Sequence, residues 1–168
     1  MKIKTKRLAV YALLVSLALI FSYLESLISL PLLPGVKLGL ANGIVLLLVW
    51  LSDIKGAALV NFVRIAVSSL LFGNLTVFYF SVLGAAFSLF IMCLAKRLKA
   101  SILFTSILGA VAHNVGQLIA AITVFMGFGP MYYLPLLCLS GILCGTLIGI
   151  VCFYLLKNKV VVNLLKNF

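Results

Sequence analysis

Residues 133–156 read YLPLLCLSGILCGTLIGIVCFYLL, a stretch without a single charged residue. A helix that crosses the hydrocarbon core of a bilayer needs roughly 20 predominantly apolar residues, and this stretch supplies them. Similar apolar runs precede it along the chain. Together they predict membrane-spanning helices over residues 8–30, 36–51, 56–72, 76–95, 102–126 and 133–156.

The composition supports the same fold class. Of the 168 residues, 65% are hydrophobic and 9% are charged, and the mean hydropathy is +1.36. A soluble domain of this size leaves too much of its surface in water to hide so many apolar side chains. We therefore expect an all-α integral membrane protein, with one transmembrane domain over residues 1–168 built as a bundle of six helices.

The polar breaks between the runs fit this division. Residues 31–35 contain two prolines and a glycine, residues 52–55 read SDIK, and residues 73–74 read GN. Residues 96–99 form a basic segment, and residues 127–130 read GFGP. Each break combines residue types that end helices or form turns.

The net charge of +11 is spread over separate clusters. With the N-terminus in the cytoplasm, every basic residue except Lys37 and Arg64 falls on the cytoplasmic side, as the positive-inside rule requires. Both termini are then cytoplasmic. A nucleic-acid partner is not expected, because its binding site would need the charge gathered on one face; membrane lipid is the expected surrounding.

Polar residues within the spans are few, and each is costly to bury in lipid. They lie at helical spacing along the first, third and fifth spans and at the start of the second, mostly at mid-membrane or in its outer half. We predict that they line a substrate-binding cavity open to the outside: Glu25, Lys37, Asn42, Arg64, His113, Asn114 and Gln117. The structural alternative is that Glu25 pairs with Arg64 or Lys37, while the amides join neighbouring helices.

Small residues recur at four-residue spacing. Gly141, Gly145 and Gly149 form a double GxxxG, and residues 112, 116 and 120 form a similar row. Such rows let helix backbones approach closely, so we expect internal packing in the last two spans. Near the inner end of the first span, Ala12 and Ser16 offer the same surface to a partner protein.

The chemistry of an enzyme is not evident. The chain has no phosphate-binding loop, and Glu25 and Asp53 are its only acidic residues, on opposite sides of the membrane. A prenyl synthase needs clustered aspartates to hold magnesium against a diphosphate. The four cysteines show no metal-ligand spacing. We expect no catalytic residue, no metal site and no cofactor.

Three motifs carry a resemblance: PGVKLGLAN at residues 34–42, LFGN at 71–74 and GAVAHNVGQ at 109–117. They resemble the Gx transporter family, whose members are often labelled heptaprenyl diphosphate synthase component I. That family is related to the substrate-binding S components of energy-coupling factor (ECF) transporters. The similarity extends over nearly the whole chain.

The resemblance implies a prokaryotic plasma membrane protein with six helices and both termini in the cytoplasm. It also implies that the outer side captures a ligand and that the first helix docks on a transmembrane subunit driven by two ATPases. The docking motif of S components is AxxxA, and its nearest match here is Ala12-x-x-x-Ser16. Ligand pockets of S components favour Lys37, His113, Asn114 and Gln117 over Arg64.

The leading hypothesis is therefore the substrate-binding subunit of an ECF-type importer. The positive charge favours an anionic or carbonyl-rich ligand, such as a flavin or another vitamin-like compound. A membrane anchor or scaffold in a flavin or quinone extracellular electron-transfer assembly is the rival hypothesis, because some relatives occur beside flavin-carrying proteins. An accessory subunit of heptaprenyl diphosphate synthase ranks last on chemical grounds.

Overall fold

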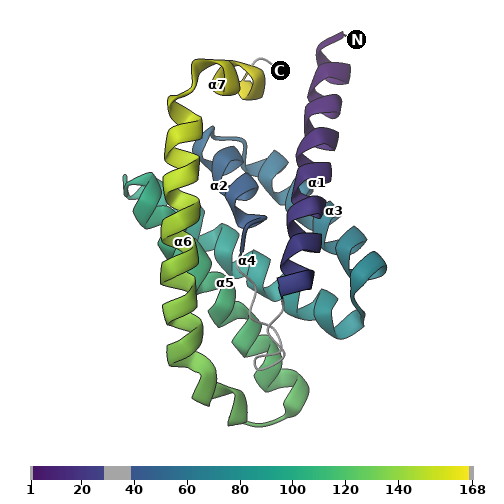
Figure 1. Ribbon diagram of the computed structural model, residues 1–168, viewed down its shortest axis with the longest axis vertical. Coiled ribbons are helices and arrows are strands. Elements are labelled where there is room, and N and C mark those ends of the chain that lie inside the picture. Colours follow the sequence, from purple (N-terminus) through teal and green to yellow (C-terminus); the bar gives the residue numbers. More distant parts are fainter. Residues whose placement is uncertain (1, 29–38, 167–168) are drawn as a thin grey trace.

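The computed structural model describes residues 2–28 and 39–166, and this part of the chain is entirely helical apart from turns (Figure 1). The elements in chain order are α1 (Lys2–Ile28), α2 (Asn42–Trp50), α3 (Ile54–Phe72), α4 (Leu75–Arg97), α5 (Ile102–Phe125), the 3₁₀ helix η1 (Gly129–Tyr133), α6 (Leu134–Lys157) and α7 (Lys159–Lys166).

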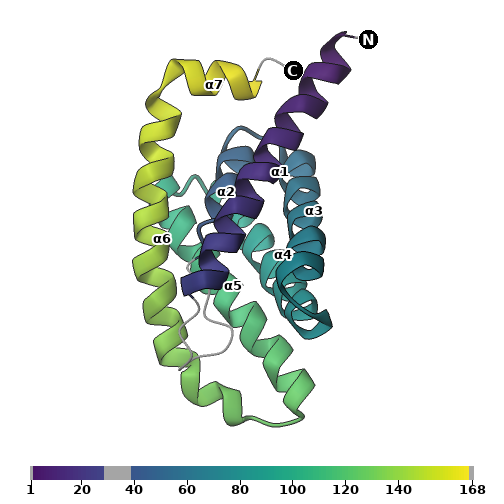
Figure 2. The same ribbon diagram turned by 45° about the vertical axis from the view of Figure 1, so that its right-hand side comes forward.

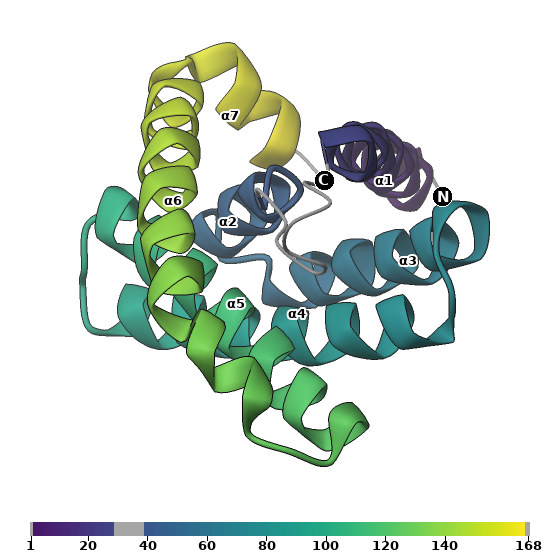
Figure 3. The same ribbon diagram turned by 60° about the horizontal axis from the view of Figure 1, so that its bottom comes forward.

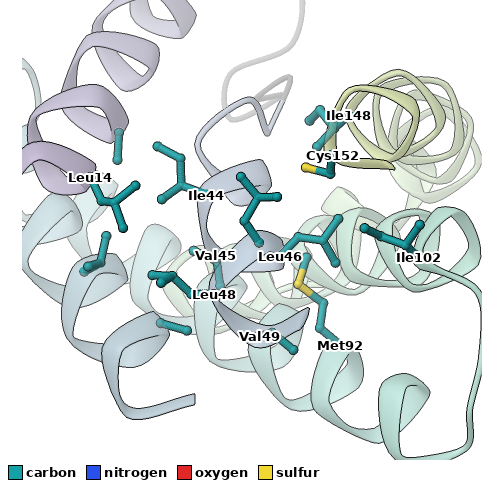
Figure 4. Packing of buried hydrophobic residues seen from close by; sticks show 14 residues of the cluster. Leu14, Ile44, Val45, Leu46, Leu48, Val49, Met92, Ile102, Ile148 and Cys152 are labelled. Carbon is teal, nitrogen blue, oxygen red and sulfur yellow. The ribbon is translucent and has the colours of Figure 1, made fainter. Parts of the chain in front are cut away.

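The short helix α2 occupies the middle of the bundle, with α1, α3, α4, α5 and α6 around it (Figure 3). Every residue from Asn42 to Val49 is buried. In Figure 4 its apolar side chains extend outward in several directions, towards Leu14 of α1, Met92 of α4, Ile102 of α5 and Cys152 of α6. A helix that is apolar all round and enclosed by other helices forms the core of this protein.

The prediction of a continuous helix over residues 36–51 is wrong in extent. Within the described residues the helix begins at Asn42, and residues 39–41 form a turn in which Gly39 has a φ of +74°. A nine-residue helix is about 14 Å long, roughly half the thickness of a hydrocarbon core. Hydropathy alone overestimated its length, because a buried core helix and a lipid-facing one are equally apolar.

The other predicted spans correspond to long helices. α3, α4 and α5 begin and end within two residues of the predicted bounds, α1 begins six residues earlier than predicted, at Lys2, and the sixth span is α6. Their outer faces carry large exposed apolar side chains, such as Leu13, Leu70, Phe90 and Leu147. Large exposed apolar surfaces of this kind are unfavourable in water and favourable in contact with lipid.

Helix N-caps lie in or just after three of the predicted breaks. The side chains of Asp53, Asn74 and Ser101 accept hydrogen bonds from the backbone N–H groups of Gly56, Val77 and Phe104, at 3.0, 2.9 and 3.2 Å. Each cap satisfies an otherwise free donor at the start of α3, α4 or α5.

The glycine row of α6 packs against α5, as predicted for internal packing. A Cβ atom on Gly145 would lie 2.7 Å from the Cα of Ile107, and one on Gly141 would lie 3.1 Å from the Cα of Val111. On α5, Gly116 faces the other neighbour, because its Cβ would lie 2.9 Å from the Cα of Gly84 in α4. α5 is thus held closely on two sides.

The last helix, α7, lies at the end of the molecule where the chain begins. α7 lies across the end of α6, and it is at the same end of the molecule as the start of α1 (Figures 1 and 2). This helix, which was not predicted, places Leu165 against the core cluster. The connection between α5 and α6 lies at the opposite end (Figure 1).

Candidate functional site

The candidate site residues surround the beginning of α2 and line the interfaces of α5. Glu25, Asn42, Arg64, His113, Asn114 and Gln117 are all buried. Lys37 lies outside the described residues. The described contacts place the six in two groups, one on α1, α2 and α3 and the other on α5.

Glu25 faces the beginning of α2. Its Oε1 accepts a hydrogen bond from the backbone N–H of Leu40, two residues before the helix starts. The N-terminal end of a helix carries a partial positive charge, so a carboxylate is favourable there. The same carboxylate is near enough to interact electrostatically with Arg64 of α3 and with Cys144 of α6.

Arg64 donates its direct hydrogen bonds to neutral groups. One terminal nitrogen donates to Asn61 Oδ1 at 2.7 Å, and the other donates to Ser22 Oγ at 3.2 Å. Among the described residues no ion pair joins Arg64 to Glu25, so their attraction acts across a longer distance. The Arg64 Nε has no hydrogen-bond partner there.

Asn42 is the first residue of α2 and is 5% exposed. Its amide nitrogen Nδ2 has no hydrogen-bond partner among the described residues. A buried donor without a partner is unusual, because it loses its hydrogen bonds to water and gains none in return.

Asn114 joins two helices. Its Nδ2 donates to the backbone carbonyl of Leu137 at 2.8 Å and to Ser140 Oγ at 3.3 Å, both in α6. This contact fits the structural alternative raised from the sequence, in which amides connect neighbouring helices.

His113 and Gln117 lie one turn apart on α5 and face α4. A Cβ atom on Gly84 would lie 3.0 Å from His113 Cε1 and 2.9 Å from Gln117 Cγ, so the glycine leaves room for both side chains. Neither Oε1 nor Nε2 of Gln117 has a hydrogen-bond partner among the described residues. Sequence reasoning singled out both side chains but missed Gly84, since an isolated glycine inside an apolar helix has no distinctive pattern.

A second set of polar contacts lies at the end of the molecule where α1 begins. It was not predicted from the sequence. Arg7 donates to Tyr11 and forms an ion pair with Asp53 at 3.3 Å, and Tyr11 donates to the same carboxylate. The Lys96 ammonium donates to the carbonyls of Val49 and Trp50 at 2.7 and 2.9 Å. These contacts join α1, α4 and the turn between α2 and α3.

Ala12 and Ser16, the predicted partner surface, are exposed on α1. The Ser16 hydroxyl donates to the backbone carbonyl of Ala12 at 2.9 Å. The hydroxyl is thereby satisfied within its own helix, so the two residues present a small, smooth surface to whatever packs there.

The fold and the buried polar groups define a class of protein. Among the described residues, five helices are long and apolar enough to cross a membrane: Thr5–Leu27, Ile54–Phe72, Leu75–Arg97, Ile102–Phe125 and Gly129–Lys157. They make the chain a multi-pass helical membrane protein.

The chain belongs to the heptaprenyl diphosphate synthase component I family, whose model matches residues 14–155. This is the family that the three sequence motifs resemble under the name of Gx transporters. No curated protein and no solved structure matches the chain.

Proposed function

We propose that this protein is the substrate-binding membrane subunit of an ECF-type importer in a prokaryotic plasma membrane. The observation that carries the proposal is a set of buried polar atoms that have no hydrogen-bond partner among the described residues: Asn42 Nδ2, Arg64 Nε and the Gln117 amide. Polar groups inside a membrane bundle are costly and mark binding or transport sites more often than packing. A small molecule with complementary polar groups would satisfy them.

The proposed orientation puts the basic end in the cytoplasm. Arg7, Lys55, Arg97, Lys99 and Lys157 belong to helix ends and turns at that end, in agreement with the positive-inside rule. The chain would then cross the membrane six times, with α2 in the second crossing. Ligand would enter from the end at which α5 joins α6.

α2 gives this proposal a physical basis. Its N-terminal end lies inside the bundle, where Glu25 contacts the preceding backbone. Short helices that end at mid-membrane are a recurrent feature of transporter binding sites, because their ends bring partial charge to the substrate. On this view Glu25 holds the helix in place, and Asn42 is the residue of α2 that faces the ligand.

Energy for transport would come from a partner. The chain has no phosphate-binding loop, so two ATPases and a transmembrane subunit would supply the driving force. The exposed surface around Ala12 and Ser16 is the proposed contact with that transmembrane subunit.

The family description suggests a prenyl synthase, and the two acidic residues argue against catalysis by this chain alone. Asp53 caps α3 and pairs with Arg7, while Glu25 binds the turn before α2. Two carboxylates on different elements, each engaged elsewhere, do not form the clustered set that holds magnesium against a diphosphate. An accessory role would show as lower long-chain prenyl diphosphate synthesis in a deletion strain.

Purification followed by mass spectrometry of the released small molecules tests the proposal. We expect a stoichiometric small molecule from the wild type, and ATPase subunits in a mild-detergent pull-down. A flavin-binding extracytoplasmic protein without any ATPase would instead support an anchor or scaffold in electron transfer. If neither a ligand nor an ATPase is recovered, the importer proposal is wrong.

A further inference from the structure

The Gln117 side chain is buried, and its amide has no hydrogen-bond partner in the part of the chain that the structure describes. The residue is 5% exposed, and both its Oε1 and its Nε2 lack hydrogen bonds among the described residues. Mutational data put the cost of such burial at about 1–3 kcal/mol for an unsatisfied group. Packing alone does not account for a glutamine here, because leucine would fill the space without that cost.

Two glycines at the contact between α4 and α5 shape the surroundings of the Gln117 side chain. Gly84 and Gly116 bring α4 and α5 together, since a Cβ on Gly116 would lie 2.8 Å from the carbonyl oxygen of Leu83. A Cβ on Gly84 would lie 2.9 Å from Gln117 Cγ. Gly84 thus leaves the space that the stem of the Gln117 side chain occupies, and Gly116 allows the two helix backbones to approach closely.

The donor and acceptor atoms of the Gln117 amide determine which ligand groups could form hydrogen bonds with it. A primary amide offers a carbonyl acceptor and an N–H donor side by side, so a partner that satisfies both must present a donor next to an acceptor. A carboxylate has acceptors only, and an ammonium has donors only. A ring lactam, a ring imide or a carboxamide has the required pair.

We propose that Gln117 recognises a neutral amide or imide edge of the transported ligand through two hydrogen bonds. The inference rests on the proposed function, because it names the chemical class that this binding site selects. Any anionic part of the ligand is then bound elsewhere. A site built around a paired donor and acceptor rejects analogues that lack one of them, because its own buried group is left unpaired.

Asn114, three residues earlier on the same helix, is the matched control. Its amide nitrogen is bonded to Leu137 and Ser140 of α6. Replacing a buried amide that is hydrogen-bonded removes those bonds and leaves its partners unsatisfied. Replacing a buried amide without hydrogen bonds removes only the free-energy cost of burying it. Asn114→Leu should therefore lower the melting temperature of the ligand-free protein, and Gln117→Leu should leave it unchanged or raise it.

The experiment measures thermal unfolding of the full chain in detergent with uracil, nicotinamide and riboflavin, which carry the same edge on different rings. The counterparts 1,3-dimethyluracil, N,N-dimethylnicotinamide and 3-methylriboflavin have no amide or imide N–H donor. We expect at least one parent compound to raise the melting temperature of the wild type. Its methylated counterpart should bind at least tenfold more weakly, and Gln117→Leu should lose the response to the parent compound.

Three results would overturn the inference: no parent compound stabilises the wild type, a methylated compound binds as well as its parent, or Gln117→Leu lowers the melting temperature of the ligand-free protein. The last would give the amide a structural role. The ATPase pull-down tests the importer proposal independently of these results. An importer whose ligand lacks an amide or imide edge would still recover ATPase subunits, whereas a protein that imports nothing would not.

Discussion

The Lys96 ammonium lies 2.7 Å from the carbonyl oxygen of Val49 and so places a positive charge at the C-terminal end of α2. It also donates to Trp50 and to Ser52 Oγ. At the other end, Glu25 accepts from the backbone N–H of Leu40. The one helix enclosed by the bundle is therefore bounded by a cation and an anion, each opposite in sign to the helix end it faces.

This arrangement explains how so short a helix persists inside an apolar bundle. The last carbonyls and first N–H groups of a helix have no partners within it, and lipid provides none. Lys96 of α4 satisfies two of the last carbonyls, Glu25 of α1 binds the backbone N–H of Leu40 just before the helix, and both charges complement the helix dipole. The position of α2 is thus determined by residues far from it in the sequence.

Replacing Lys96 by methionine should destabilise the protein. The change removes the three hydrogen bonds that the ammonium donates. A hydrogen bond to a charged group contributes up to about 3 kcal/mol to stability. We expect a loss of about 2–3 kcal/mol in the free energy of unfolding, measured by denaturation in detergent micelles. Arg97→Met is the control, since Arg97 is the next residue, is exposed and belongs to the same last turn. Equal losses for both variants would refute the role of Lys96.

Glu25 should separate the effect of charge from that of the hydrogen bond. Glu25→Gln retains an acceptor for the Leu40 N–H but removes the attraction to Arg64, whereas Glu25→Leu removes both. We expect a loss of about 1 kcal/mol for the glutamine variant and roughly 3 kcal/mol for the leucine variant. The readout is thermal unfolding, and Ser26→Ala at the exposed neighbour should change little. If glutamine costs as much as leucine, the charge rather than the Leu40 bond sets the stability at this position.

Hydropathy was sufficient to predict the long helices, because a lipid-facing helix must be apolar along its whole length. It could not distinguish α2, whose residues are as apolar as those of the spans but are buried by other helices. The signal for its true start was local: Gly39 adopts a positive φ, and Asn42 follows it. The breaks before α3, α4 and α5 could be predicted from their polar residues, but the capping roles of Asp53, Asn74 and Ser101 were not predicted.

The candidate site could be predicted only as a set of residue types. Counting polar residues in apolar helices singled out Glu25, Arg64 and Gln117, all of which are buried. The pattern could not reveal which amides already had partners, because the bonds of Asn114 go to residues of α6. Nor could it reveal the Lys96 contact, since a lysine in a basic loop suggests only a solvated charge.

The close packing of α5 and α6 should tolerate no added methyl group at Gly145. A Cβ there would lie 2.7 Å from the Cα of Ile107 and 3.1 Å from the Ser106 carbonyl oxygen, and backbone atoms cannot yield as a side chain does. Gly145→Ala should therefore cost about 1–3 kcal/mol, because the two helices must move apart. Gly129→Ala is the control, since nothing lies within 4 Å of its Cβ position. A melting temperature of Gly145→Ala equal to that of Gly129→Ala would contradict the packing.

The orientation can be tested by reporter fusions, because the two reporters work on opposite sides of a bacterial membrane. With the basic end inside, green fluorescent protein fused after Lys157 should fluoresce, and alkaline phosphatase fused there should be inactive. Alkaline phosphatase fused at Gly73 or Gly129 should be active, since these residues lie at the start of the α3–α4 turn and of η1. A fusion after Lys99, between α4 and α5, should again favour fluorescence.

The decisive position is Lys55, at the beginning of α3. It is cytoplasmic only if α2 and the residues before it return the chain across the membrane. Phosphatase activity at Lys55 together with fluorescence after Lys157 would show that α2 does not complete a crossing.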